Sequence, residues 1–408
     1  MRKHHHESGL AIATVLMLTT VMLLLGAAST RLVIQSLKDT SKEFTDHAQA
    51  SNVAQAGLQD AIGWFKNQDQ QPVQAPASSS CADEGFAPVY SDDELVSETI
   101  DESQGIVRDY QISGNIYGRY IVPRSDCSTA STQLVRDVSV QRAKTAGSSI
   151  PNGTVWSIFS EGIVYIRNDF TKNSDSYSFN TGPEDAPNRI LSRAAVKSEI
   201  VRIAMRAPTS PVSVTASSGG HTFGSRCHLI GDDDATSAIN YFSGGSLPSA
   251  TLITPGGLAM RESNPEQLTT EVFFGVTDNE LRGLSDRVYT NVNSLPERLP
   301  FSITYLQGNF TFTPEKPLAG EGLLYVNGNL TLKNNSNSLF TGIIYVTGQL
   351  TVGRDNSLSG AVITGRMNCN ATSGNTSIEY NHNIVRNTQN RLGLYRENNL
   401  SYSIIEVE

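Results

Sequence analysis

Three copies of one short phrase follow each other at intervals of twenty residues in the last third of the chain. The phrases are ITYLQGNFTF, LLYVNGNLTL and IIYVTGQLTV, and a shortened fourth copy, AVITGRMNCN, follows at seventeen. Two short strands repeated around a glycine turn predict a β-solenoid, in which successive coils stack and equivalent side chains form ladders. The equivalent residues are Tyr305, Tyr325 and Tyr345, and Gly308, Gly328 and Gly348.

The strand after each glycine alternates apolar residues with threonine, which predicts apolar side chains inside the solenoid and threonines outside. Before the glycine both faces are apolar, with Leu324 and Val326 on one face and Leu323 and Tyr325 on the other. One face should fill the solenoid core. The other should be covered by the pilin domain or by a partner protein, and we prefer covering by the same chain. The predicted inward residues are Phe310, Phe312, Leu330, Leu332, Leu350 and Val352; the outward ones are Thr311, Thr331 and Thr351.

The segment Leu10–Ser29 near the start of the chain carries no charged residue. Twenty residues of helix span about 30 Å, the thickness of the hydrocarbon core of a bilayer. Arg2 and Lys3 precede the segment, and positive charge holds such a leader in the cytoplasm. The sequence therefore predicts one membrane-spanning helix, with the rest of the chain exported.

An amphipathic pattern continues from Arg31 to Lys66 without a proline. Apolar and small residues recur there at steps of three, four or seven, which is the spacing of one helix face. We therefore expect one helix that begins in lipid, continues into water and needs lateral partners. The residues of the predicted face are Leu37, Phe44, Ala48, Ser51, Leu58, Ile62 and Phe65.

The leader that ends at Gly9, the apolar helix directly after it and the continuation HAQASNVAQAGLQDAIGWF resemble type IV pilins and type II secretion pseudopilins. Within that superfamily the chain most resembles minor pilins of the PilX and GspK kind. Most pilins carry glutamate at the fifth residue after the leader glycine, where this chain has Thr14. The same departure marks the PilX and GspK subset, whose members are inferred to sit at or near the filament tip. The resemblance implies cleavage after Gly9 by a prepilin peptidase and an N-methylated Leu10.

An ordinary secretory signal peptide is the alternative, because LLLGAAST would suit cleavage near Ala28. The chain would then be a secreted or membrane-anchored solenoid that binds or cleaves carbohydrate. A cleaved signal does not, however, predict the amphipathic continuation.

The expected fold class is α+β, with a long N-terminal pilin helix, an antiparallel pilin-like β-sheet and a C-terminal β-solenoid. Short segments of strand character, among them IVRDYQI and SIFSEGIVYI, predict the sheet.

Residues 208–300 look irregular apart from one short helix that begins at Thr277. Glu280 completes a capping box there, and Leu281, Leu284 and Val288 give the helix an apolar face. The expected domains are a leader (1–9), the pilin helix (10–66), a linker (67–94), the pilin-like domain (95–207), the irregular region (208–300) and the solenoid head (301–408).

Four cysteines, none in a CxxC pair, favour disulfides over zinc in an exported chain. Three pairings are possible. We favour Cys81 with Cys127, since both lie near loop-forming sequence, which leaves Cys227 to pair with Cys369 across a long stretch of chain.

The chain shows no motif of nucleophilic, metalloprotease or nucleotide chemistry. In the repeats, Glu321, Asp355, Arg354 and Arg366 are the only candidates for polysaccharide cleavage, and the two carboxylates occupy different phases of the repeat. We therefore expect no enzyme activity and no cofactor.

The run Asp232, Asp233 and Asp234 is a weak candidate for a calcium site, and a solvated turn is the preferred interpretation. His221 and His228 are interpreted as ordinary loop residues.

A net charge of −9 does not indicate the basic surface that binding to nucleic acid requires.

The function expected from the resemblance is a minor pilin that primes assembly of a type IV pilus or caps its tip, with the solenoid as a head for partner or surface contact. A type II secretion pseudopilin is the related alternative. The expected partners are other pilins, a tip adhesin, the prepilin peptidase and the inner membrane before assembly. The expected location is the inner membrane with a periplasmic domain, and later the pilus tip at the cell surface.

Overall fold

The structure is a computed structural model of the 408-residue chain. It describes residues 17, 45–68, 71–73, 105–123, 135–139, 153–168, 183–184, 186–206, 208–215, 221–232, 237–242, 259–264 and 269–405. The predicted leader, most of the apolar segment and most of the linker lie outside these residues. Among the residues described, no helix combines the length and the apolar character needed to cross a membrane.

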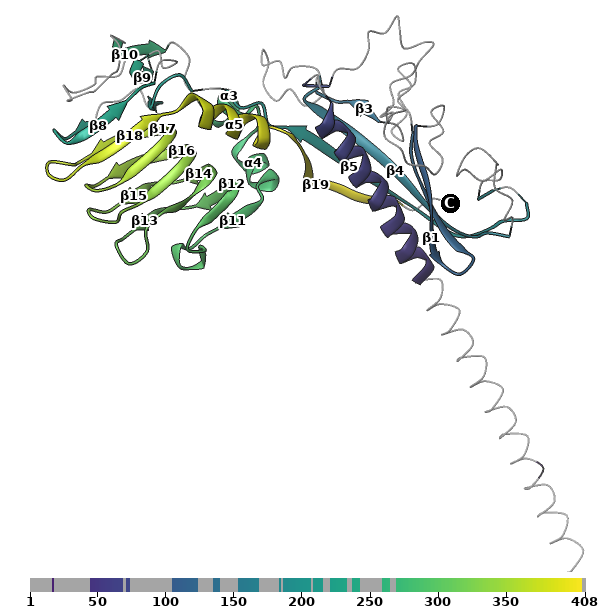
Figure 1. The fold of residues 1–408 in the computed structure, drawn as a ribbon. Helices are drawn as coiled ribbons and strands as arrows, with labels where there is room; N and C mark the ends of the chain where they lie inside the picture. The colour runs from purple at the N-terminus through teal and green to yellow at the C-terminus, as the bar shows by residue number, and fades with distance from the viewer. Residues whose placement is uncertain are drawn as a thin grey trace, which may run out of the picture.

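A helix over residues 45–67 lies against an antiparallel sheet, and the two form the body of the molecule (Figure 1). The strands run in the order β1-β2-β4-β5-β19, with β3 paired to β4. They are β1 (Gly105–Ser113), β2 (Ile116–Pro123), β3 (Arg136–Asp137), β4 (Val155–Ile166), β5 (Arg189–Arg202) and β19 (Tyr395–Ile405).

The helix buries one face on this sheet. Small residues allow close contact, because a Cβ at Gly162 of β4 would lie 2.2 Å from the carbonyl oxygen of Ala50. Phe65 packs against Trp156, with ring centroids 5.1 Å apart. Of the predicted helix face, Leu58, Ile62 and Phe65 are buried, whereas Ser51 is partly exposed and Ala48 is exposed. Leu37 and Phe44 lie outside the described residues.

The last strand of the chain, β19, belongs to the body and not to the solenoid. It pairs antiparallel with β5, from Tyr395 opposite Arg202 to Ile405 opposite Ala195. The expected solenoid head of 301–408 is therefore wrong at its C-terminal end. Nothing in the local pattern of β19 could reveal this, because strand alternation reports which face is buried and does not name the neighbouring strand.

The predicted solenoid is present, and its strands pair in parallel with the expected register (Figure 1). Tyr305 lies opposite Tyr325, and Tyr325 opposite Tyr345. The shortened fourth copy places Ile363 opposite Tyr345. The strands are β11 (Arg287–Tyr289), β12 (Leu299–Gln307), β13 (Phe310–Phe312), β14 (Ala319–Asn327), β15 (Leu330–Leu332), β16 (Leu339–Val352), β17 (Ser357–Cys369) and β18 (Thr376–Tyr380).

Much of the region expected to be irregular, 208–300, is also part of the solenoid. β6 and β7 pair in parallel with β17, β8 pairs with β18, β9 pairs with β6, and β10 pairs with β9. Earlier segments thus complete the stack beyond the last repeat. The expected boundary is wrong because these strands are short and do not follow the twenty-residue spacing. They are β6 (Val212–Val214), β7 (Thr222–Phe223), β8 (Cys227–Ile230), β9 (Ser237–Phe242) and β10 (Ala259–Asn264).

Two apolar clusters lie on the two sides of the long solenoid strands. Leu324 and Val326 belong to the solenoid interior, together with the inward residues of the short strands. Leu323 and Tyr325 belong to a second cluster on the outer side. Three helices of the same chain supply apolar residues to that cluster, so the prediction that this chain covers the outer face is confirmed. The helices are α3 (Thr270–Phe274), α4 (Asp278–Leu284) and α5 (His382–Leu392).

Helix α4 begins as the sequence predicts. Thr277 is its N-cap, and the side chains of Thr277 and Glu280 form the reciprocal hydrogen bonds of a capping box. Leu281 and Leu284 are buried against the solenoid. Val288, expected on the same helix face, is instead exposed in β11, because the helix ends at Leu284. A 3-10 turn, η2 (Val292–Ser294), then leads into β12.

Candidate functional site

Between the partly exposed Asp46 and the exposed Lys66, the exposed residues of the 45–67 helix carry no charge. Asp60 is the exception within the helix interior, but it faces the sheet, where Tyr120 donates a hydrogen bond to its carboxylate at 2.5 Å and Arg108 approaches to 3.3 Å. Such a face can pack against other helices without burying an unpaired charge, which would be costly. The exposed residues from Thr45 to Gln59 are Thr45, Ala48, Asn52, Gln55, Ala56 and Gln59, called here the neutral helix face; Gln59 also donates a hydrogen bond to Glu397 of β19 at 3.1 Å.

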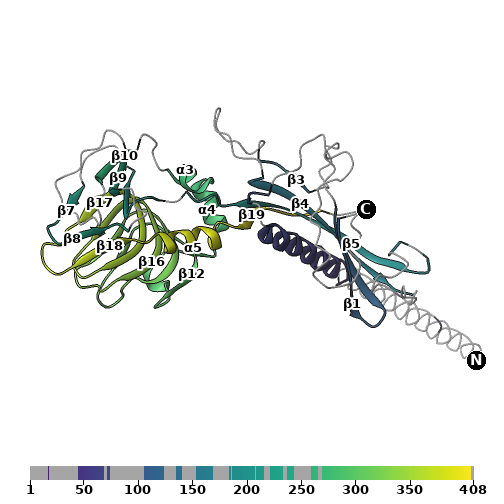
Figure 2. The same cartoon turned by 45° about the horizontal axis from the view of Figure 1, so that its top comes forward.

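The body and the solenoid join beside the C-terminal end of this helix, where two segments of chain cross between them (Figure 2). One follows β5 and the other is the start of β19. Arg396 of β19 donates hydrogen bonds to the carboxylate of Asp286 at 2.6 Å and to the carbonyl oxygen of Leu284 at 3.3 Å. Partial burial, and then the charge of Arg396, lower the pKa of nearby Lys66 on the helix.

Tyr395, at the start of β19, fixes this junction to the body. Its ring is buried, and its hydroxyl accepts a hydrogen bond from the backbone nitrogen of Val73 at 2.9 Å and donates one to the carbonyl oxygen of Gly153. Burial raises its pKa to about 12. One of the two chain connections to the solenoid is therefore fixed to the body by a buried, hydrogen-bonded tyrosine.

The three repeat tyrosines stack beneath helices α3 and α4. The rings of Tyr305 and Tyr325, and those of Tyr325 and Tyr345, have centroids 5.1 Å apart with interplanar angles of 19° and 6°. Tyr305 donates a hydrogen bond to Asp278 at 2.9 Å, and the hydroxyls of Tyr325 and Thr270 lie 2.7 Å apart. Burial raises the pKa of Tyr305 and of Tyr345 to about 12. The stack is a structural joint, since the hydroxyl of Tyr305 reaches Asp278 on α4 and that of Tyr325 reaches Thr270 on α3.

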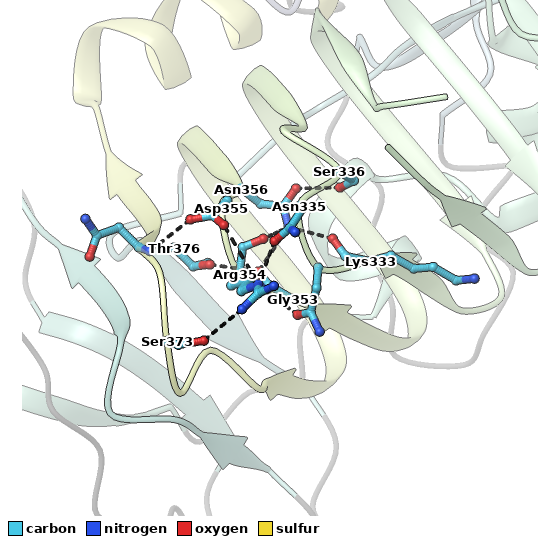
Figure 3. Close-up of polar contacts among 11 residues, drawn as sticks. Lys333, Asn335, Ser336, Gly353, Arg354, Asp355, Asn356, Ser373 and Thr376 are labelled. Atoms are coloured by element: carbon cyan, nitrogen blue, oxygen red, sulfur yellow. Dashed lines mark hydrogen bonds and ion pairs between the residues drawn. The ribbon is translucent and has the colours of Figure 1, made fainter. Parts of the chain in front are cut away.

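The turns at one corner of the solenoid form a closed polar network (Figure 3). Asn356 is buried, and its amide nitrogen donates to the carbonyl oxygens of Lys333, Gly353 and Arg354 at 3.0 to 3.1 Å. Its amide oxygen accepts from Ser336 Oγ at 2.6 Å. This arrangement satisfies buried polar groups and holds successive turns together.

The exposed side of the same corner is also internally paired. Arg354 donates to Asn335 at 2.6 Å and to Ser373 at 3.1 Å, and its guanidinium lies 4.0 Å from Asp355. Asp355 in turn accepts a hydrogen bond from the backbone nitrogen of Asn375 at 3.2 Å. The corner therefore has the arrangement of a stabilising turn.

The other charged candidates for polysaccharide cleavage do not meet Asp355. Glu321 lies on β14 opposite Thr341 of β16, and its carboxylate is 3.7 Å from Arg298. Arg366 is exposed on β17, opposite Gln349. The two carboxylates thus occupy different columns of the solenoid, as the repeat phase indicates.

Neither the acidic run nor the histidines form a metal cluster in the described part of the chain, where no group of three His, Cys, Asp or Glu side chains could hold an ion. Asp232 accepts a hydrogen bond from the backbone nitrogen of His382 at 2.7 Å. Asp233 and Asp234 lie outside the described residues. His221 is buried, and its Nδ1 accepts from the backbone nitrogen of Met367 at 3.3 Å. His228 lies on β8 opposite Ser377.

Cys227 of β8 and Cys369 of β17 form a disulfide, with Cα atoms 6.1 Å apart. Cys81 and Cys127 lie outside the described residues, as do Gly9, Leu10 and Thr14.

Sequence reasoning missed Tyr395 and Asn356. Tyr395 gave no signal, since it is a single tyrosine outside any repeat or motif. Asn356 follows Arg354 and Asp355 between two repeats, and an Asp-Asn pair at a predicted turn is a sequence signal that could have marked it.

Comparison with known proteins finds no matching family model and no curated relative. One solved structure with similarity is the competence-associated pilin ComZ from Thermus thermophilus, at 11% identity and a TM-score of 0.21, covering 88% of this chain and 97% of that one. The TM-score is too low to define the fold or the function of this chain, so the interpretation rests on its own residues.

Proposed function

We propose that the protein is a minor pilin that primes or caps a type IV pilus and carries its solenoid as a head. The observation that carries the proposal is the neutral helix face. It follows the uncharged segment Leu10–Ser29 in the sequence, after a stretch that carries Arg31, Lys38, Asp39, Lys42 and Glu43, and it lies on the exposed side of the helix whose other side packs on the antiparallel sheet. A helix with one side on its own sheet and a second, uncharged side left exposed is suited to lateral packing against helices of other subunits.

The placement of the solenoid supports an end position. It joins the body beside Lys66, at the end of the helix farthest from Leu10 in sequence, and it extends away from the helix (Figure 1). A subunit stacked farther along the filament on that side would have to occupy the volume of the head. Thr14, in place of the glutamate common in pilins, is consistent with a subunit that needs no contact above it.

The partners that follow are major and minor pilins along the neutral helix face, with the prepilin peptidase acting at Gly9 and Leu10. A pseudopilus of a type II secretion system would use the same helix. The chain would reside in the inner membrane before assembly and at the pilus tip afterwards.

The first test is the N-terminal mass of the chain purified from its native membrane, with and without the prepilin peptidase. We expect a mature chain that begins at Leu10 and carries one methyl group, and an uncleaved chain when the peptidase is absent. Cleavage near Ala28 that is independent of the peptidase would reject the proposal.

The second test charges the neutral helix face. The side chain of Gln55 is exposed, so Gln55→Glu should leave the folded monomer unaffected. We expect it to reduce cross-linking to neighbouring pilins and the number of pili per cell. Asn387→Glu on α5, also exposed and with the same charge change, is the matched control. Equal pilus numbers for Gln55→Glu and the wild type would argue against packing through this face.

A further inference from the structure

The outer side of the short solenoid strands is a flat, polar surface with one row of side chains for each coil. β13, β15 and the second half of β16 pair in register, so equivalent side chains align in columns across the strands. Neighbouring strands lie about 4.8 Å apart, which repeats each column at that spacing. We call this surface the amide face, and define it by the columns Asn309, Asn329 and Gln349, and Thr311, Thr331 and Thr351.

The asparagines of the amide face point their amide oxygens at the next coil. Asn309 Oδ1 accepts a hydrogen bond from the backbone nitrogen of Asn329 at 2.9 Å, and Asn329 Oδ1 accepts from that of Gln349 at 2.8 Å. Since a backbone N–H can only donate, these bonds fix the orientation of both amides. Both side chains are exposed, so their NH2 groups remain as donors towards solvent. The surface therefore displays amide donors on the first two coils, whereas Gln349 on the third donates to Thr351 Oγ1 at 3.3 Å.

The amide face carries no carboxylate. The strand segments 309–313, 329–333, 349–353 and 366–370 contain no Asp or Glu, and they contribute Lys333 and Arg366, although the whole chain has a net charge of −9. Glu315, in the turn before Lys316, is the nearest carboxylate in sequence to the first segment. A hydrogen bond from Thr313, and also the charge of nearby Lys333, lower its pKa. A surface of donors with weak positive charge complements a partner rich in acceptors and negative charge.

The amide face is also held rigidly. Phe310, Leu330 and Leu350 are fully or almost fully buried directly behind it. The disulfide of Cys369 lies next to Asn368, which is opposite Thr351 and extends the threonine column. A preorganised surface loses little conformational entropy when it binds a ligand.

From these observations we propose that the amide face binds an acidic polysaccharide, with carboxylates and ring oxygens of the polymer accepting from the asparagine NH2 groups, the threonine hydroxyls and Lys333. A nucleic acid fits less well, because the surface offers no aromatic side chain for stacking and few cations for a phosphate backbone. The proposal does not depend on how the chain is anchored, since a chain cleaved near Ala28 would carry the same surface.

The test is affinity electrophoresis of the full chain in a non-ionic detergent, through native gels that contain alginate, a polyuronate, or dextran, a neutral glucan. We expect alginate to retard the protein and dextran to leave it unchanged. The informative variant is Asn309→Asp with Asn329→Asp, which keeps both acceptors of the coil-to-coil bonds and replaces each displayed donor by an acceptor. It should weaken alginate binding at least tenfold.

The matched control is Asn387→Asp with Asn390→Asp, two exposed positions on α5 that give the same change in charge on another surface. It should bind alginate as the wild type does. Should the double variant of the amide face fail to fold, Lys333→Glu, an exposed side chain, takes its place and should also weaken binding.

Three results would overturn the proposal: no retardation of the wild type by alginate, equal loss of binding in the α5 control, or displacement of alginate by a single-stranded oligonucleotide at the same charge concentration. The last would mean general anion binding. None of these results bears on cleavage after Gly9, so failure here is distinguishable from failure of the pilin assignment.

Discussion

Cys227 and Cys369 join two neighbouring coils of the solenoid from positions 142 residues apart in the chain. Cys227 belongs to the segment that precedes the repeats, and Cys369 belongs to the last repeat. The bond therefore fastens the β6–β8 strands to the stack that the repeats build.

Replacing both cysteines should destabilise the solenoid without changing its register. In the chain-entropy account, closing a loop of this length contributes up to about 5 kcal/mol, because it restricts the unfolded chain. We expect Cys227→Ser with Cys369→Ser to lower the melting temperature and to make the chain near β6–β8 more sensitive to limited proteolysis. An unchanged proteolysis pattern would mean that strand pairing alone holds these coils.

Gly342 should tolerate no side chain. Its φ is 141°, and a Cβ there would lie 1.9 Å from the carbonyl oxygen of Gly322 in the coil before it. Gly342→Ala should destabilise the solenoid by more than about 3 kcal/mol in urea denaturation, because both backbone strain and a steric clash oppose it. Gly63→Ala is the control. Nothing lies within 4 Å of its added methyl group, and alanine there should stabilise the helix by about 0.5 to 1 kcal/mol.

Removing the hydroxyl of Tyr325 should cost less than removing its ring. Tyr325→Phe loses the contact with Thr270 and should destabilise by about 1 kcal/mol. Tyr325→Ala also loses stacking on both sides, and we expect about 3 to 5 kcal/mol. A double-mutant cycle of Tyr325→Phe with Thr270→Val checks the first value. Additive effects in that cycle would show that the two hydroxyls do not interact.

The solenoid should lose stability on acidification through His221. Burial, and then the nearby charge of Arg366, lower the pKa of His221 below its ordinary value of 6.5, so the unfolded chain binds a proton more readily than the folded one. The lost stability should therefore develop as the pH falls below about 6.5 towards the lower folded pKa. His221→Asn retains an acceptor for Met367 but does not titrate. Its melting temperature should fall less than that of the wild type between about pH 7.5 and about pH 5. An identical fall in the two proteins would exclude His221 as the cause.

The repeats made the solenoid predictable in detail because they report register directly. Residues at a fixed spacing become neighbours in adjacent coils, so Tyr305, Tyr325 and Tyr345 could be stacked from sequence alone. The capping box at Thr277 was predictable for a similar reason, since its hydrogen bonds join residues three positions apart. The amide face follows from the same spacing, but the orientation of its asparagines required the backbone contacts of the next coil.

Sequence alone thus determined the features set by local periodicity: the solenoid register, its inward ladders, the start of α4, and the buried residues Leu58, Ile62 and Phe65 of the helix. Tertiary structure alone decided which distant segments complete each layer. It placed β19 beside β5, stacked β6–β8 on the last repeat, and covered the outer apolar face with α3, α4 and α5. The physical reason is that strand pairing and apolar burial depend on shape and register. They do not depend on how far apart two segments lie in the sequence. A segment therefore shows that it needs a partner without showing which one it will find.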